Sequence, residues 1–176
     1  YGSAATCSET APIDPSISNT TAALRKRGGC FDTNNNDVDF SIGNPSPRNS
    51  ASPANSCTPA TLTIGQIQGN ALVTPYANQF VATSGIVTAT KSNGFYMQMP
   101  APGDNDAATS DGIFVFTQSA PAVTPGNAVL VQGTAGEFFQ LTQIDASLPG
   151  DVTVQSADAL PAPIALTPQI LDGTGV

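Results

Sequence analysis

The chain has 176 residues, of which 40 % are hydrophobic and only 10 % are charged, and its formal net charge is −8. This hydrophobic content excludes a wholly disordered chain, and the length suits one domain or a small domain with an arm. The absence of His removes the usual zinc ligand and the general base of the serine triad, so any enzyme here would depend on carboxylates alone. A surface of uncharged polar side chains is typical of secreted proteins, and no apolar run is long enough to cross a bilayer.

Composition changes near residue 57, which predicts two parts, residues 1–57 and 58–176. The first part is polar and irregular, with four basic against five acidic residues. We expect two strands in it, Thr20–Arg27 and Val38–Ile42, followed by a linker rich in Pro, Ser and Asn over residues 44–59.

All three cysteines of the chain, Cys7, Cys30 and Cys57, lie in this first part. An odd number predicts one disulfide and one free or intermolecular thiol. We expect the pair Cys7–Cys30, because these two cysteines flank the same candidate strand.

The only basic cluster of the sequence is Arg25-Lys26-Arg27. Together with Arg48 of the linker, it is a candidate for contacts with nucleic-acid phosphates. The alternative is a solvated strand end that is closed by the two glycines at positions 28 and 29.

Segment 32–37 places oxygen ligands at alternating positions, Asp32, Asn34 and Asn36, which suits a hard cation such as Ca²⁺. The Gly and the distant Glu of an EF-type loop are missing, so we favour an Asx-rich turn between two strands. A second candidate cation loop lies between two strands of the second part and contains Asp104, Asp106 and Asp111.

The second part has β-branched residues in short runs between Gly, Pro and Asn, which predicts an all-β fold. Five strands with glycines inside the two long ones favour a small closed barrel of the OB type, with a β-sandwich as the alternative. We expect a tight hairpin at 91–94, a further short strand over Thr61–Gln68, and an extended Pro-rich arm over Leu160–Pro168. The five predicted strands are Gln79–Thr90, Gly94–Met99, Gly112–Thr117, Ala128–Phe139 and Asp151–Ser156.

Aromatic side chains on these strands are candidates for stacking with bases. In Gly94–Met99, alternation predicts that Phe95 and Met97 are buried and that Tyr96 and Gln98 are exposed. Both faces of Gly112–Thr117 are apolar, so packing in the core is the alternative for its aromatic residues. The candidate nucleic-acid-binding residues of the second part are Lys91, Tyr96, Phe114, Phe116 and Phe138.

Six segments in order, LTIGQIQG, FVATSGIVTA, NGFYMQM, DNDAATSDGIFVF, AVLVQGTAGEFFQLTQI and LPAPIALT, resemble the OB-like domain of large secreted bacterial nucleases. The stretch NTTAALRKRGGCFDTNNNDVDFSIGNPSPRNSASP is similar to the end of a lamin-tail domain, an immunoglobulin-like sandwich that often precedes the OB module. The resemblance implies an incomplete lamin-tail arm followed by a five-stranded OB-like barrel. The catalytic domain of those nucleases has no counterpart, so the resemblance implies the role of the non-catalytic arms.

These observations predict a secreted, non-catalytic module of the extracellular-nuclease type that binds extracellular DNA. The second part carries one lysine against eight acidic residues, a net charge of −7 that repels a polyanion unless Ca²⁺ or the basic arm compensates. The alternative is an extracellular structural protein whose residues 1–50 join copies into oligomers or filaments by strand exchange. A third possibility is a carbohydrate-binding module that uses the same barrel face.

Overall fold

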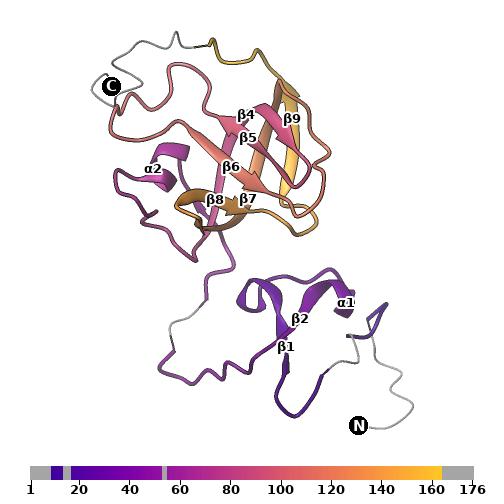
Figure 1. Cartoon of the computed structure of the whole chain (residues 1–176). Helices are drawn as coiled ribbons and strands as arrows, with labels where there is room; N and C mark the ends of the chain where they lie inside the picture. The colour runs from indigo at the N-terminus through magenta and orange to yellow at the C-terminus, as the bar shows by residue number, and fades with distance from the viewer. Residues whose placement is uncertain (1–8, 14–16, 53–54, 164–176) are drawn as a thin grey trace. The chain divides into compact units, whose positions relative to one another are not determined.

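A computed structural model describes residues 9–13, 17–52 and 55–163 (Figure 1). The chain divides into two compact units, Tyr1–Thr58 and Pro59–Val176. Strands dominate the secondary structure, which confirms the all-β expectation. No helix in the described ranges is long and apolar enough to cross a membrane.

The first unit is built on two short antiparallel strands, β1 (Ala22–Arg25) and β2 (Phe40–Gly43). A 3₁₀ turn, η1 (Lys26–Gly29), and one helical turn, α1 (Asn36–Asp39), connect them. Both strands are shorter than or displaced from the expected ranges. Arg27 and Gly28 adopt positive φ and end β1, and the Asn35 side chain accepts a hydrogen bond from the Asp37 N–H and starts α1, which takes Val38 out of β2.

A disulfide joins Cys30 to Cys57, so the expected Cys7–Cys30 pair is wrong. Cys7 itself lies outside the described residues. The segment that contains Cys57 returns to the turn after β1, where the Asn55 amide donates to the carbonyls of Arg27 (2.8 Å) and Gly28 (3.2 Å). The polar stretch treated as a linker therefore contributes to the first unit.

The second unit contains a closed ring of five strands in the order β4-β5-β6-β8-β7, with β7 also paired to β4 (Figure 1). β6 and β8 are parallel, and every other pair in the ring is antiparallel. Within residues 59–163, two strands lie outside the ring, one parallel to β4 and one antiparallel to β7. The elements are β3 (Ala60–Thr61), α2 (Ile64–Gln68), β4 (Phe80–Lys91), β5 (Gly94–Gln98), β6 (Gly112–Phe116), β7 (Asn127–Phe138), β8 (Leu141–Asp145) and β9 (Val152–Ala157).

The ring has a different fifth member from the expected one. The predicted strand Asp151–Ser156 corresponds to β9, which among the described strands pairs with β7 alone, and β8 completes the ring. The sequence prediction missed β8 because the turn before it is Phe139-Gln140, two non-glycine residues that both adopt positive φ. The expected hairpin at 91–94 is confirmed by the pairing of Lys91 with Gly94.

The expected strand over Thr61–Gln68 is wrong for most of its length. Only Ala60–Thr61 is a strand, and Ile64–Gln68 is a helix. The Thr63 hydroxyl accepts a hydrogen bond from the Gln66 N–H while the Gln66 side chain accepts one from the Thr63 N–H, so a capping box fixes the helix start.

The hydrophobic core fills the ring and includes both isoleucines of α2, which are fully buried. Phe95 and Met97 of β5 belong to it, as alternation predicted. At Gly133 of β7 an added Cβ would collide with the carbonyl of Asp145, so glycine permits the close approach of β7 and β8. Residues 158–163 form no strand, and the rest of the predicted Pro-rich arm lies outside the described ranges.

Candidate functional site

A second apolar cluster lies on the outer face of β5 and β6. In β6, Ile113 and Val115 point into the core, so Phe114 and Phe116 occupy the opposite face. Tyr96 of β5 lies on that outer face and is 37 % exposed, in agreement with the predicted alternation. The alternation of buried residues in β6 therefore shows which face its aromatic side chains occupy, which the sequence alone could not decide.

Phe114 is only 6 % exposed although it is not part of the core cluster. The Tyr96 ring packs against it with centroids 5.0 Å apart and an interplanar angle of 54°. The Lys91 ammonium lies 5.6 Å from the centre of the Phe114 ring. Tyr96 on β5 and Lys91 at the end of β4 belong to the same sheet as Phe114. Phe114 is therefore the centre of a small aromatic platform on the outer face of the barrel.

The turn between β7 and β8 exposes large apolar side chains. The rings of Phe138 and Phe139 contact each other edge to face, with centroids 4.7 Å apart. Phe139 is 90 % exposed, and Phe138 and Leu141 are also exposed. Water contact at three large apolar side chains is unfavourable, and such patches commonly mark binding surfaces.

Strand β8 supplies polar groups beside the aromatic platform. Gln143 pairs in register with Phe114, and Asp145 pairs with Phe116. Both side chains point to the outer face, because Thr142 and Ile144, which alternate with them along β8, are buried.

These side chains line one cleft of about 450 Å³ on the second unit. The cleft brings together the five predicted binding residues of this unit. Sequence reasoning did not assign the polar residues Asn93, Gln143 and Asp145 to the site. It did not assign Leu141 either, although the outward alternation of positions 141, 143 and 145 is visible once β8 is recognised. The lining residues are Lys91, Asn93, Tyr96, Phe114, Phe116, Phe138, Phe139, Leu141, Gln143 and Asp145.

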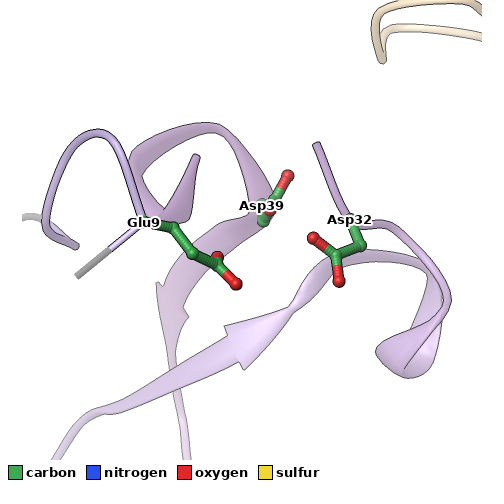
Figure 2. Close-up of side chains that lie close together, drawn as sticks. All are labelled: Glu9, Asp32 and Asp39. Carbon is green, nitrogen blue, oxygen red and sulfur yellow. The ribbon is translucent and has the colours of Figure 1, made fainter. Parts of the chain in front are cut away.

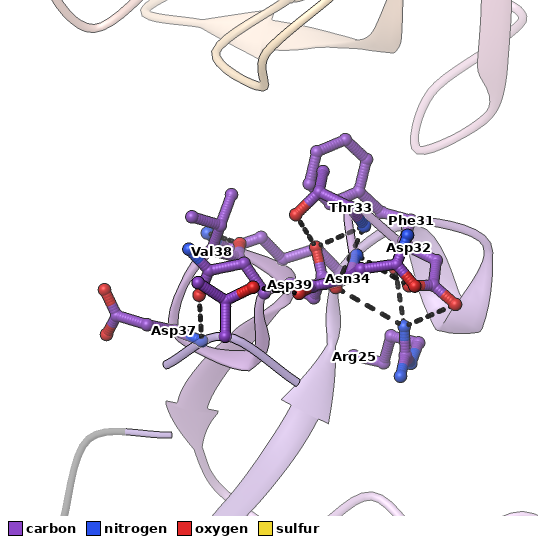
Figure 3. A network of polar contacts seen from close by, with 11 residues as sticks. Arg25, Phe31, Asp32, Thr33, Asn34, Asp37, Val38 and Asp39 are labelled. Atoms are coloured by element: carbon purple, nitrogen blue, oxygen red, sulfur yellow. Dashed lines mark hydrogen bonds and ion pairs between the residues drawn. The ribbon is translucent and has the colours of Figure 1, made fainter. Parts of the chain in front are cut away.

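Among the basic residues expected to contact phosphates, Arg25, Lys26 and Arg27 contact other residues of the first unit, and Figure 3 shows the contacts of Arg25. The Arg25 guanidinium donates to the carbonyl of Phe31 (3.0 Å) and lies 4.6 Å from the ring centre of Phe40. Lys26 donates to the carbonyl of Val38 at 2.7 Å. Arg27 lies 5.6 Å from the Phe31 ring centre, and Arg48 is exposed in the coil after β2.

Asp39 is the most buried charged group of the first unit, with 0 % exposure. Its carboxylate accepts hydrogen bonds from the Thr33 hydroxyl (2.7 Å) and the Thr33 N–H (2.9 Å), and lies 3.8 Å from Arg25. Burial by itself raises the pKa of this carboxyl, but the hydrogen bonds from Thr33 and Asn35 and the charge of Arg25 together outweigh it, so the pKa of Asp39 lies below its ordinary value.

Glu9, Asp32 and Asp39 place one carboxylate oxygen each within 4.8 Å of the others (Figure 2). Arg25 lies 3.4 Å from Asp32 and partly neutralises the group. Of the predicted calcium ligands, only Asp32 belongs to it. The Asp32 carboxylate accepts from the Asn34 N–H, an Asx turn.

The acidic loop of the second unit is also closed by local hydrogen bonds. The Asp104 carboxylate accepts from the Asp106 N–H, and the Asp111 carboxylate accepts from the Asp104 N–H. In the ranges that the structure describes, these three carboxylates are not gathered into a group of the kind formed by Glu9, Asp32 and Asp39.

Comparison with known protein families finds no match, and a search of curated proteins finds none either. The resemblance to nuclease-associated lamin-tail and OB-like modules therefore stays a prediction.

Proposed function

We propose that the second unit is an OB-type barrel that binds single-stranded nucleic acid in the aromatic cleft. The ring order, in which the third and fifth strands are parallel and the fourth closes on the first, supports this assignment. OB barrels bind oligonucleotides on the face of their second and third strands and on the loops joining strands one to two and four to five.

The cleft occupies the corresponding positions. Tyr96 and Phe114 lie on the second and third ring strands, β5 and β6. Asn93 lies in the turn between the first two, and Phe139 in the turn between the last two. The gathering of five aromatic rings in one cleft at this place is the observation that carries the proposal.

The expected affinity is modest. Stacking contributes about 1–3 kcal/mol per base, so two stacked bases supply roughly 2–6 kcal/mol. Lys91 is the only basic residue of a unit with eight acidic ones, so phosphate contacts add little. Stacking and not charge is thus the main source of the proposed affinity. This modest affinity suits the proposed accessory role in a secreted, non-catalytic module.

The test compares the full chain with two single variants, using a labelled single-stranded hexanucleotide and fluorescence anisotropy. Phe139→Ala removes a ring that is 90 % exposed, so it does not cost the barrel its packing. We expect it to weaken binding by about fivefold to 150-fold, since one base–aromatic contact is worth about 1–3 kcal/mol. Leu72→Ala removes an equally exposed apolar side chain outside the cleft (86 % exposed) and should leave binding unchanged.

Equal binding by Phe139→Ala and the unmodified chain would refute the proposal. Binding of a neutral oligosaccharide, with no binding of DNA at any salt concentration, would instead identify the cleft as a carbohydrate site.

Assembly of copies through the first unit is a second candidate function. In the described part of that unit, β1 and β2 pair only with each other, so each has one unpaired edge. Strand addition by a second copy would satisfy those backbone groups. Sedimentation velocity over a wide concentration range tests this, and a constant monomer at the highest concentration would contradict it.

A further inference from the structure

The cleft contains two opposite charges that do not neutralise each other. Lys91 and Asp145 both line it, yet neither takes part in an ion pair in the described ranges. The ammonium of Lys91 lies over the ring of Phe114, and Asp145 of β8 pairs in register with Phe116 of β6. The lining of the cleft therefore contains a cation, an anion and several aromatic rings.

Asp145 is held in a defined orientation. Its Oδ1 accepts a hydrogen bond from the Ser147 N–H (3.1 Å), and the second oxygen has no partner among the described residues. The residue is exposed. Gln143, two positions earlier on the same face, makes no side-chain hydrogen bond in this part of the chain either. Both groups are thus available to a ligand.

A ligand that satisfies this arrangement has three features. It carries a negative group for Lys91, a planar ring for the aromatic side chains, and an edge with hydrogen-bond donors for Asp145, because an ionised carboxylate only accepts. A nucleotide has all three. The charge pattern also distinguishes among nucleotides, since bases differ in the donors on their Watson–Crick edges.

We propose that Asp145 makes the cleft select bases with amino groups, guanine above all, over thymine. This inference rests on the proposed nucleic-acid function. Guanine presents an N1–H and an amino group side by side, two donors for one carboxylate. Cytosine and adenine present one amino group each. Thymine presents a single N–H between two carbonyl oxygens, which a carboxylate repels.

The experiment uses the full chain and four labelled hexanucleotides, hexathymidylate and three relatives in which one central thymine is replaced by guanine, cytosine or adenine. We expect the guanine hexamer to bind about tenfold more tightly than hexathymidylate, within the range for a good base contact. The other two should fall between them.

Asp145→Asn tests the cause. Asparagine keeps an oxygen for the Ser147 N–H and adds an amide donor that thymine can accept, so the tenfold preference should fall to less than twofold. Asp158→Asn is the matched control, because Asp158 is exposed, belongs to the same unit, accepts a local backbone N–H from Ala159, and does not line the cleft. It removes the same charge and should keep the preference.

The outcomes separate the two proposals. Equal affinity for all four hexamers, or a preference that survives in Asp145→Asn, overturns the role of Asp145 and leaves stacking in the cleft intact. A change of equal size in both variants for every hexamer also overturns it, because it reveals a general charge effect. Failure of every hexamer to bind overturns both proposals.

Discussion

Loss of the Cys30–Cys57 disulfide should unfold the first unit and leave the barrel folded. The bond closes a loop with a sequence separation of 27 residues. In the chain-entropy treatment, a loop of that length limits the unfolded chain enough to contribute about 3.5 kcal/mol to stability. Phe31 is the only buried hydrophobic residue that the structure describes in this unit, so the core adds little. Domains this small generally need a disulfide or a bound metal to be stable.

Hydrogen exchange measured by mass spectrometry on the full chain reads the two units separately. In Cys57→Ser, or after reduction, amides of β1 and β2 should exchange as fast as in an unfolded peptide. Amides of β4 and β7, which pair over seven positions inside the ring, should remain protected.

Cys7→Ser provides the matched control, since it replaces the third cysteine and leaves the Cys30–Cys57 bond intact. It should not change protection in β1 and β2. Protection of these strands in Cys57→Ser, or equal loss of protection in Cys7→Ser and Cys57→Ser, would contradict a stabilising role of the disulfide.

Three further predictions concern single side chains. The pKa of Asp39 is lowered in the folded state, so ionised Asp39 stabilises the first unit above the ordinary pKa of 3.8, and this stabilisation is lost as the pH falls through the lower folded value. Urea unfolding followed by circular dichroism should show the loss of stability in acid, and Asp39→Asn should make the stability of the first unit less dependent on pH in this range. Glu137→Ala removes the acceptor for the Thr74 N–H and the Thr142 hydroxyl (both 2.8 Å) and should lower the barrel's free energy of unfolding by about 1–3 kcal/mol in urea titrations. Thr63→Ala breaks the capping box of α2 and should cost about 1 kcal/mol in the same titration, and an unchanged midpoint would contradict that role.

Elements that depend on neighbouring residues in the sequence could be predicted from turn sequences and from the alternation of polar and apolar residues. The hairpin at 91–94 contains an Asn-Gly sequence, and the alternation in β5 assigned Phe95 and Tyr96 to opposite faces. The helix α2 also had a local signal, a Thr followed three residues later by Gln. Its short apolar run was interpreted as a strand because five residues are too few for helical periodicity to be decisive.

The features that were not predicted depend on contacts distant in sequence. The turn before β8 uses Phe139-Gln140 at positive φ, a strained choice that pairing of β8 with both β6 and β7 stabilises. Without β8, the positions of Gln143 and Asp145 in the site could not be foreseen. The partner of Cys30 likewise depends on where residues 55–57 return, which no spacing rule fixes.

The distribution of positive charge changes what binding should look like. The sequence predicted phosphate contacts by the basic cluster and hence a steep loss of DNA affinity with salt. Arg25 and Lys26 already serve acceptors of their own unit, and the cleft holds Lys91 alone. One neutralised phosphate on a single strand gives a slope of about −0.7 in log affinity against log salt. Added salt also screens the repulsion between the acidic barrel and the nucleic acid, which acts in the opposite direction. Stacking in the cleft therefore predicts a slope between about −0.7 and zero, and a slope several times steeper would move the binding site from the aromatic cleft to the basic residues of the first unit.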